Sequence, residues 1–286
     1  MNDRRTPATP GHEHGETGDT GDPGETGRTG ADRGAHPRAP HGDHRSDPVP
    51  EQRQATPREH VVFDAPFGDR TAWAAGRTSA YPPDGRNPGD NKLDRIGPAF
   101  APTADGVFRA HRAADGLWNA DLVSTEYAPG GFELLPGDDL RATCLVHDVQ
   151  GAWPALWTWG RDTGSGRPQP GHGEVDAFEY HPTNPRMLEL TNHVHPAACY
   201  ADDLVTPGRP FTLRVLFGSA SVQWWVDGHQ VFADGTGVGR HWRAWLIVGI
   251  SVAAGGYGHL PPAPGTRELE WRCSALTVSR SPAGQA

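Results

Sequence analysis

Short apolar or alternating runs recur about every ten residues from Val61 onward, separated by glycine, proline, aspartate and asparagine. No segment shows an apolar stripe with helical spacing. So many short strands predict an all-β fold, built as a two-sheet antiparallel sandwich or jelly roll. The strands that we expect are 106–110, 118–124, 140–147, 155–159, 174–179, 187–194, 211–217, 222–226, 230–232, 245–253 and 268–278.

The first sixty residues have almost nothing to contribute to a core. Residues 1–60 contain no Leu, Ile, Phe, Trp, Tyr or Cys, so Met1 and Val49 are their only sizeable apolar side chains. Six consecutive Gly-x-y triplets fill residues 15–32, a collagen-like spacing, but they hold one proline and no trimerisation segment follows them. We expect a disordered, low-complexity N-terminal tail over 1–60 and one domain over 61–286, which holds all ten tryptophans.

One hairpin is signalled directly. The run Val222–Val226 is followed by Asp227-Gly228 and then by a second apolar run at 230–232. Asp-Gly between two apolar runs favours a two-residue turn with positive φ. We therefore predict a β-hairpin with Asp227 and Gly228 at its tip.

The charge balance indicates neither a nucleic acid nor a membrane as partner. The tail carries 8 basic and 11 acidic residues, and the remainder carries 18 and 24, so both parts are mildly acidic. No window approaches the roughly 18–20 apolar residues of a membrane span, and polar sequence stands where a signal peptide needs its hydrophobic region. We expect a monomer, and the sequence leaves its compartment open.

Metal and disulfide chemistry are also poorly signalled. The cysteines, Cys144, Cys199 and Cys273, are too few and too widely spaced for a zinc knuckle or a disulfide framework, and they permit at most one bridge. The histidines of the tail lie in sequence that would not hold them in a coordination geometry. We predict no metal and no cofactor, with a structural calcium left as an open possibility.

Three carboxylates occupy one expected strand. Side chains of a strand alternate between its faces, so Glu174 and Asp176 point the same way, whereas Glu179 would point the opposite way. A β-bulge between Asp176 and Glu179, with Ala177 or Phe178 as the extra residue, would return all three acids to one face. We predict such a bulge.

Three acids on one sheet face repel one another, so such an arrangement is more often functional than accidental. A carboxylate pair suits glycoside hydrolysis, in which one acts as nucleophile and the other as general acid and then base. A retaining mechanism needs carboxyl groups about 5 to 5.5 Å apart, which requires a curved strand with the acids on its concave side. The alternatives are an exposed acidic strand face and a calcium site.

The neighbouring motifs carry a family resemblance. The chain has Gly-x-Trp-Pro-Ala-x-Trp at 151–157, Glu-x-Asp-x-x-Glu at 174–179, Trp-Trp-Val-Asp-Gly at 224–228 and Gly-Gly at 255–256. In this order they resemble glycoside hydrolase family 16, in its bulged branch of laminarinase-like endo-β-1,3-glucanases and agarases. The resemblance covers roughly residues 61–280.

The resemblance implies a concanavalin A-like β-jelly roll that hydrolyses internal β-linkages of a polysaccharide with retention, most simply those of β-1,3-glucan. By position, it implies that Glu174 is the nucleophile, Asp176 the assisting residue and Glu179 the acid/base. One departure from the family pattern is Ser251, where asparagine is common.

Sugar-binding residues are carried over in the same way. Trp153 and Trp157 match tryptophans of the family's cleft, where apolar sugar faces pack on aromatic rings. His195 resembles a histidine on the strand after the catalytic one, and His193, on the same expected strand face, is the alternative. Tyr180 and Tyr257 are weaker candidates. These tryptophans could equally be core residues, and the histidines ordinary polar strand residues.

Two other functions remain open at this point. A lectin-like polysaccharide-binding protein without turnover could use the same jelly roll, although binding does not need three crowded carboxylates. A structural or adhesion protein that depends on the Gly-x-y segment is the third hypothesis.

Overall fold

The computed structural model describes residues 60–86, 91–160, 169–256 and 258–281. Almost all of the regular structure there is β-strand, with one short 3₁₀ helix, η2 (Pro170–Gly173). The predicted tail, apart from His60, and Tyr257 lie outside the described residues, and the domain boundary near residue 61 stays a prediction. Among the described residues, no helix is long and apolar enough to span a membrane.

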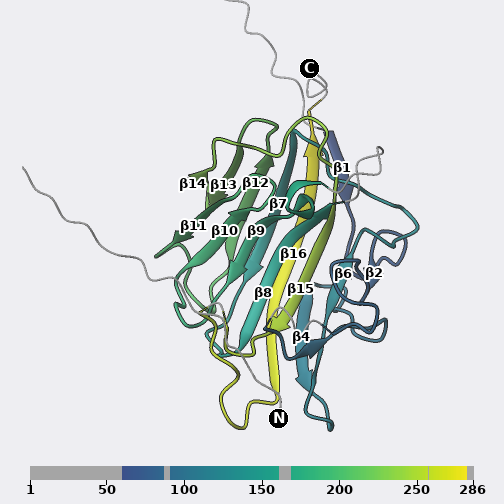
Figure 1. Ribbon diagram of the computed structural model, residues 1–286, viewed down its shortest axis with the longest axis vertical. Helices are drawn as coiled ribbons and strands as arrows, with labels where there is room; N and C mark the ends of the chain where they lie inside the picture. The colour runs from purple at the N-terminus through teal and green to yellow at the C-terminus, as the bar shows by residue number, and fades with distance from the viewer. Residues whose placement is uncertain (1–59, 87–90, 161–168, 257, 282–286) are drawn as a thin grey trace, which may run out of the picture. The chain divides into compact units, whose positions relative to one another are not determined.

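The strands form two sheets (Figure 1). The larger one, called here the back sheet, has nine strands within the described residues, in the order β14-β13-β12-β7-β16-β4-β5-β3, with β1 paired to β16. Its pairs are antiparallel except for the parallel pair of β3 and β5. Its strands are β1 (His60–Asp64), β3 (Asp94–Arg95), β4 (Val107–Arg112), β5 (Trp118–Ala120), β7 (Asp138–Leu145), β12 (Phe211–Phe217), β13 (Val222–Val226), β14 (His229–Ala233) and β16 (Glu268–Arg280).

The second sheet, called here the front sheet, has seven strands among the described residues, in the order β11-β10-β9-β8-β15-β6-β2. All of its pairs are antiparallel. Its strands are β2 (Ala74–Ala75), β6 (Leu122–Ser124), β8 (Ala152–Gly160), β9 (Val175–Tyr180), β10 (Leu188–Asn192), β11 (Ala197–Ala201) and β15 (Ala244–Val252).

The core lies between the sheets. Strand β9 packs over β12, and β8 over β16. Alternate residues of these strands point inward, as in β12, where Phe211, Leu213, Val215 and Phe217 are all buried. Their aromatic neighbours interlock across the gap: the Phe178 ring meets that of Trp271 edge to face, with centroids 5.5 Å apart. The all-β, two-sheet jelly roll is therefore confirmed.

The predicted hairpin is present. Strands β13 and β14 pair antiparallel on either side of Asp227 and Gly228, which have φ values of 49° and 80°. Both residues thus adopt the positive φ that a tight two-residue hairpin turn requires.

The cysteines form no disulfide in this structure. Cys144 in β7 and Cys273 in β16 are buried cross-strand partners, and both are free thiols. Cys199 lies apart from them, in β11 of the front sheet, and is also free.

Candidate active site

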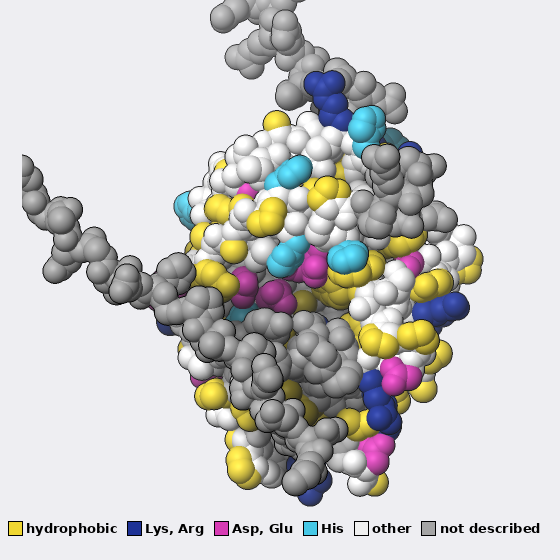
Figure 2. Space-filling view, viewed as in Figure 1, with side chains coloured by type: hydrophobic (Ala, Val, Ile, Leu, Met, Phe, Trp, Pro, Cys, Tyr) yellow, Lys and Arg dark blue, Asp and Glu magenta, His cyan; other side chains and the backbone are white. Residues whose placement is uncertain are grey.

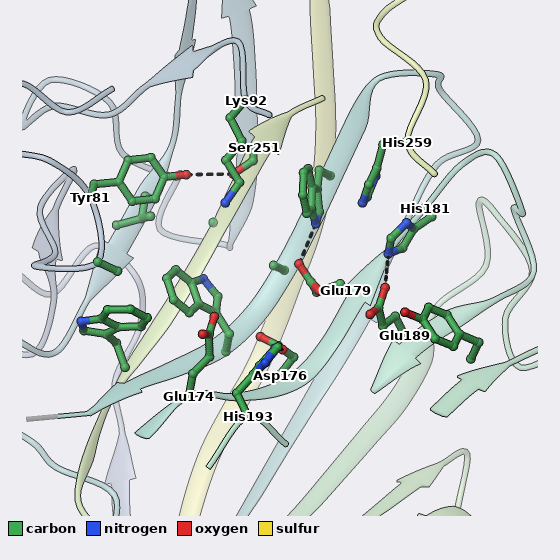
Figure 3. A pocket seen from close by; sticks show the side chains of 18 residues that line it. Tyr81, Lys92, Glu174, Asp176, Glu179, His181, Glu189, His193, Ser251 and His259 are labelled. Atoms are coloured by element: carbon green, nitrogen blue, oxygen red, sulfur yellow. Dashed lines mark hydrogen bonds and ion pairs between the residues drawn. The ribbon is translucent and has the colours of Figure 1, made fainter. Parts of the chain in front are cut away.

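A cavity of about 690 Å³ lies on the outer face of the front sheet. Figure 2 shows acidic and histidine side chains gathered in the middle of one face of the molecule. The side chains that line the cavity come from β8, β9, β10, β11 and β15 and from loops that flank them, and ten of them are labelled in Figure 3. They include Glu174, Asp176 and Glu179, the three acids of the predicted strand.

A bulge places these acids on one face. Against β8, Leu156 pairs with Phe178 and Trp157 pairs with Asp176, so Ala177 is left without a partner. Both Ala177 and Phe178 point into the core, with 1% and 0% of their surfaces exposed. Two consecutive inward residues return Glu179 to the face of Asp176. The register confirms the predicted bulge and identifies Ala177 as the residue that β8 leaves unpaired.

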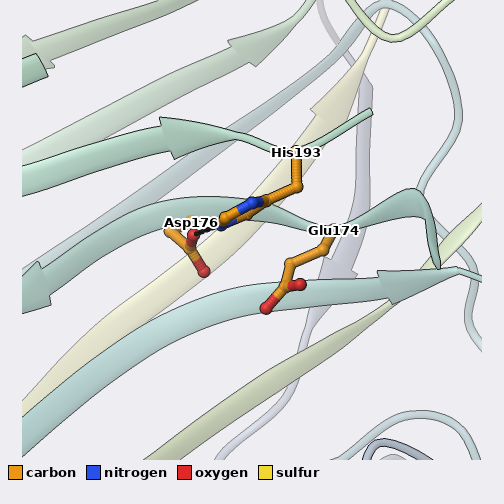
Figure 4. Close-up of side chains that lie close together, drawn as sticks. All are labelled: Glu174, Asp176 and His193. Atoms are coloured by element: carbon orange, nitrogen blue, oxygen red, sulfur yellow. Dashed lines mark hydrogen bonds and ion pairs between the residues drawn. The ribbon is translucent and has the colours of Figure 1, made fainter. Parts of the chain in front are cut away.

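Glu174 and Asp176 form one cluster with His193 (Figure 4). His193 Nε2 lies 3.1 Å from Asp176 Oδ2. The Asp176 side chain is 4% exposed and that of His193 is 45% exposed, so the histidine covers the carboxylate from the solvent side. One polar atom from each of the three residues lies within 4.8 Å of the other two. Glu174 and Asp176 thus share one imidazole neighbour at the cavity wall.

Glu179 has different neighbours. The Trp153 indole Nε1 of β8 donates a 2.7 Å hydrogen bond to Glu179 Oε1. Across the sheet, Glu189 in β10 is its direct register partner. His181 Nε2 in turn lies 2.8 Å from Glu189 Oε2, so that carboxylate has an imidazole of its own (Figure 3).

Glu174 and Glu179 hold their protons to an unusually high pH. Burial and the nearby Asp176 raise the pKa of Glu174 to about 8, whereas the charges of His193 and Lys92 oppose this. Burial, Asp176 and Glu189 raise the pKa of Glu179 to about 8 as well, against the Trp153 hydrogen bond and the Lys92 charge. At neutral pH, the cavity therefore carries less negative charge than its number of carboxyl groups suggests.

Lys92, the only lysine of the chain, lines the cavity. Its Nζ lies 4.9 Å from the ring centroid of Trp153 and 5.5 Å from that of Tyr81. The Tyr81 hydroxyl lies 2.9 Å from Ser251 Oγ, so these side chains form a polar wall beside the acids. Nearby, burial raises the pKa of Asp94 to about 6, although the Lys92 charge favours its ionised form.

The predicted sugar-binding residues fall into two groups. Trp153, Trp157 and His193 line the cavity, with Trp159 beside them. Tyr180 does not: it is completely buried, and its hydroxyl donates to the Pro185 carbonyl at 3.2 Å. That prediction is wrong because the bulge ends before Tyr180, which therefore alternates back into the core.

The structure favours His193, the alternative, over His195 as a cavity residue. Strand β10 ends at Asn192, whose Oδ1 accepts hydrogen bonds from the amides of Val194 and His195. This side-chain turn reverses the chain, so the two histidines do not share a strand face. His193 enters the cavity, whereas His195 is exposed and is not among its lining residues.

Several cavity residues were missed at the sequence level. Lys92, His181, Glu189 and His259 all line the cavity. His181 and Glu189 could have been found, since His181 directly follows β9 and Glu189 lies on β10, close to the predicted acids. Lys92 and His259 come from loops distant in sequence, and no local pattern marks them.

Two groups of side chains bring three potential ligand atoms within 4.8 Å of one another. One is Glu174, Asp176 and His193, and the other is Glu179, His181 and Glu189. In each, the histidine is already paired with a carboxylate, and Glu179 accepts a hydrogen bond from Trp153. We assign no metal ligand to either group.

The structure thus combines a two-sheet jelly roll with clustered carboxyl groups in a tryptophan-lined cavity. Comparison with solved structures identifies the same fold in endo-β-1,3-glucanases. The catalytic domain of a laminarinase from Thermotoga petrophila is 20% identical, with a TM-score of 0.62 over 79% of this chain and 100% of that one. The endo-β-1,3-glucanase of Pyrococcus furiosus is 17% identical, with a TM-score of 0.61 over 79% of this chain and 95% of that one.

A third similar structure is described differently. It is an immunostimulatory antigen and pseudo-β-1,3-glucanase of Mycobacterium tuberculosis, 21% identical, with a TM-score of 0.57 over 77% of this chain and 99% of that one. At such identities, the likeness is one of fold. No protein-family model matches the sequence. No curated protein matches it either.

Proposed function

We propose that this chain is a retaining, endo-acting glycoside hydrolase of family 16, with β-1,3-glucan as its substrate. The observation that carries the proposal is the bulge of β9, which turns Asp176 and Glu179 into the cavity that Glu174, just before the strand, also lines. The similar structures named as laminarinases and endo-β-1,3-glucanases support the choice of reaction and of glucan. The proposed reaction uses no metal and no cofactor.

The surroundings of the two glutamates support different roles. Glu174 lies in one cluster with His193, which acts on the pKa of Glu174 against burial and so favours the ionised carboxylate that a nucleophile needs. Glu179 faces Glu189, whose negative charge favours the protonated form that a general acid needs. Burial raises the pKa of both glutamates to about 8, so they compete for protons, and these opposing neighbours support Glu174 as the one that ionises and acts as nucleophile. Glu179 is then the acid/base, with Asp176 as the assisting residue.

The proposed reaction has two steps. In the first, a Glu174 oxygen attacks the anomeric carbon while the bond to the leaving sugar breaks and Glu179 gives its proton to the departing oxygen. In the second, Glu179 takes a proton from water, and that water displaces Glu174 from the anomeric carbon. Loss of the negative charge of Glu174 in the intermediate lowers the pKa of Glu179. Glu179 is then able to act as a base.

Tryptophan rings beside the acids offer flat apolar surfaces on which sugar rings can stack. Trp157 and Trp159 line the cavity, with ring centroids 5.9 Å apart in an edge-to-face arrangement. One face of Trp153 is covered, because the His259 ring stacks on it with a centroid distance of 3.7 Å. We therefore assign sugar stacking to Trp157, and to Trp153 mainly the hydrogen bond to Glu179.

The test is release of reducing ends from laminarin by the full chain, with lichenan, agarose and galactan as competing substrates. Glu179→Gln should lower kcat/KM by about 100- to 10,000-fold, and Glu174→Gln at least as much. The matched control is Glu270→Gln, an exposed glutamate of the back sheet. The first product observed by NMR should be the β-anomer, as retention requires.

Two outcomes would contradict the proposal. Hydrolysis that survives both active-site substitutions would exclude these residues as the acids. Binding of laminarin without any release of reducing ends, across the four polysaccharides and several pH values, would instead indicate a non-catalytic polysaccharide-binding protein. That alternative is kept because one similar structure is described as a pseudo-β-1,3-glucanase.

A further inference from the structure

The carboxyl group of Glu189 lies beside the proposed acid/base, and the proposed reaction does not use it. Glu189 is the cross-strand partner of Glu179, and both line the cavity. One carboxylate oxygen of each and one ring nitrogen of His181 lie within 4.8 Å of one another (Figure 3). Two carboxyl groups at this separation repel strongly when both are ionised, so they compete for protons.

His181 makes Glu189 easier to ionise than Glu179. Its Nε2 lies 2.8 Å from Glu189 Oε2, and the side chains are only 6% and 15% exposed. A partner this close, shielded from water, favours the ionised form of Glu189. Glu179 instead accepts its 2.7 Å hydrogen bond from the neutral indole of Trp153. The negative charge is thus held on Glu189, and the proton remains on Glu179.

A stack of three rings fixes this arrangement. The His259 ring lies between those of Trp153 and His181, with a centroid distance of 3.7 Å to each. His259 is 3% exposed, and neither of its ring nitrogens has a hydrogen-bond partner among the described residues. Burial, aided by the charges of His181 and Lys92, lowers the pKa of His259 to about 3. His259 is therefore a neutral spacer that joins the donor of Glu179 to the partner of Glu189.

We propose that Glu189, held in place by His181, is a positioning residue that keeps the catalytic proton on Glu179 until the sugar binds. This inference deepens the proposed function and rests on it for the role of Glu179. In this role, the Glu189 carboxylate does not contact the reacting atoms. It acts through Glu179, by opposing a second negative charge beside it.

Other charged groups also change the pKa of Glu179, and the effect of Glu189 adds to theirs. Asp176, on the same strand, raises its pKa in the same direction as Glu189, and Lys92 lowers it. Burial opposes ionisation of Glu189, but the close contact with His181, the Tyr200 hydrogen bond and the His193 charge together hold its pKa below the usual value. The remaining titratable groups that line this cavity among the described residues are Tyr81, Glu174, His193, Tyr200 and His259.

The hydrogen bond from Trp153 provides a direct measurement that does not depend on activity. The indole N–H resonance of Trp153, identified by its loss in Trp153→Phe, should shift as Glu179 titrates, and this shift should vanish in Glu179→Gln. In Glu189→Gln, which keeps the shape and removes the charge, the midpoint should fall by about one pH unit. In Glu189→Asp, which restores the charge, it should return to within about half a unit of the original value.

Kinetics then test the consequence. The alkaline limb of the kcat/KM profile reports loss of the Glu179 proton, so Glu189→Gln should move it to lower pH by the same amount as the NMR midpoint. Glu270→Gln, on the back sheet, should leave both unchanged. Thermal melting of each variant at low pH tests whether it is folded, so that a shift of the midpoint is not mistaken for a folding defect.

The two proposals fail in different ways. If the Trp153 midpoint is the same in Glu189→Gln as in the unaltered protein, the role of Glu189 is refuted, whatever the activity. If the midpoint falls as expected but the chain hydrolyses none of the polysaccharides, the charge coupling stands and the proposed function is refuted.

Discussion

Replacing Glu179 by glutamine should stabilise the folded protein, and the gain should grow as the pH rises. The buried carboxyl has a pKa of about 8 in the folded state, compared with a reference value of 4.5. Between these values, the folded state keeps the proton that the unfolded chain releases. The stability contributed by the protonated carboxyl is therefore complete below about pH 4.5 and is lost as the pH rises towards 8. Glutamine does not titrate, so the variant escapes this loss.

The magnitude follows from the slope of stability against pH. For one group in this window, the free energy of unfolding falls by about 1.4 kcal/mol per pH unit, or about 2.7 kcal/mol between roughly pH 5 and pH 7. Solvent in the cavity screens part of this, and we expect a difference of about 1.5 kcal/mol. In Glu179→Gln, the amide oxygen of the new side chain can still accept the Trp153 hydrogen bond, so no donor is left unsatisfied.

Urea denaturation of the full chain at several pH values between about 5 and 8 measures this difference. The free energy of unfolding of Glu179→Gln, minus that of the unaltered protein, should increase steadily across the range. Glu270→Gln, at an exposed position, should show no such trend. A constant difference would refute the reasoning, because Glu179 would then titrate alike in the folded and unfolded states.

Two further predictions concern neighbouring and distant groups. Trp153→Phe removes the hydrogen bond that lowers the pKa of Glu179, so the alkaline limb of the activity profile should move to higher pH while kcat falls by about tenfold. Cys144 and Cys273 are almost completely buried, so their thiols should react with a disulfide reagent only on unfolding, whereas the part-exposed Cys199 should react in the folded state, as counted by thiol titration.

Most of the sheet structure was readable from the sequence, because half-buried strands alternate. The predicted boundaries of β12 and β13 are those observed. Strand β11 was missed, since Ala197–Ala201 consists mainly of alanine and forms a sheet edge. The short strands β2 and β3, of two residues each, carry no periodicity at all.

The acid cluster was predictable because charge and periodicity conflict there. A regular strand would have sent Glu179 into the core, and only a bulge returns it to the face of Asp176. The unpaired residue was not predictable, since Ala177 and Phe178 both point inward and either could have filled that position.

The turn that directs His193, and not His195, into the cavity was not predictable for a similarly local reason. Asn192 is completely buried, and its Nδ2 donates a 3.0 Å hydrogen bond to the Gly237 carbonyl. Its Oδ1 caps the turn that ends β10. An alternating pattern that continues to residue 194 conceals this stop, because asparagine ends a strand only when tertiary contacts hold its side chain.

The protonation states of the cavity acids could not be predicted from the sequence, because residues of other elements set the pKa values of the acids in and beside β9. Asp176 is paired with His193 from the turn after β10, and Glu189 with His181 from the end of β9. Lys92, from a distant loop, acts on Glu174 and Glu179 together. The proposed roles of the two glutamates therefore depend on which histidine–carboxylate pair each one faces. Exchanging these partners would alter the protonation of the site while leaving its acidic motif intact.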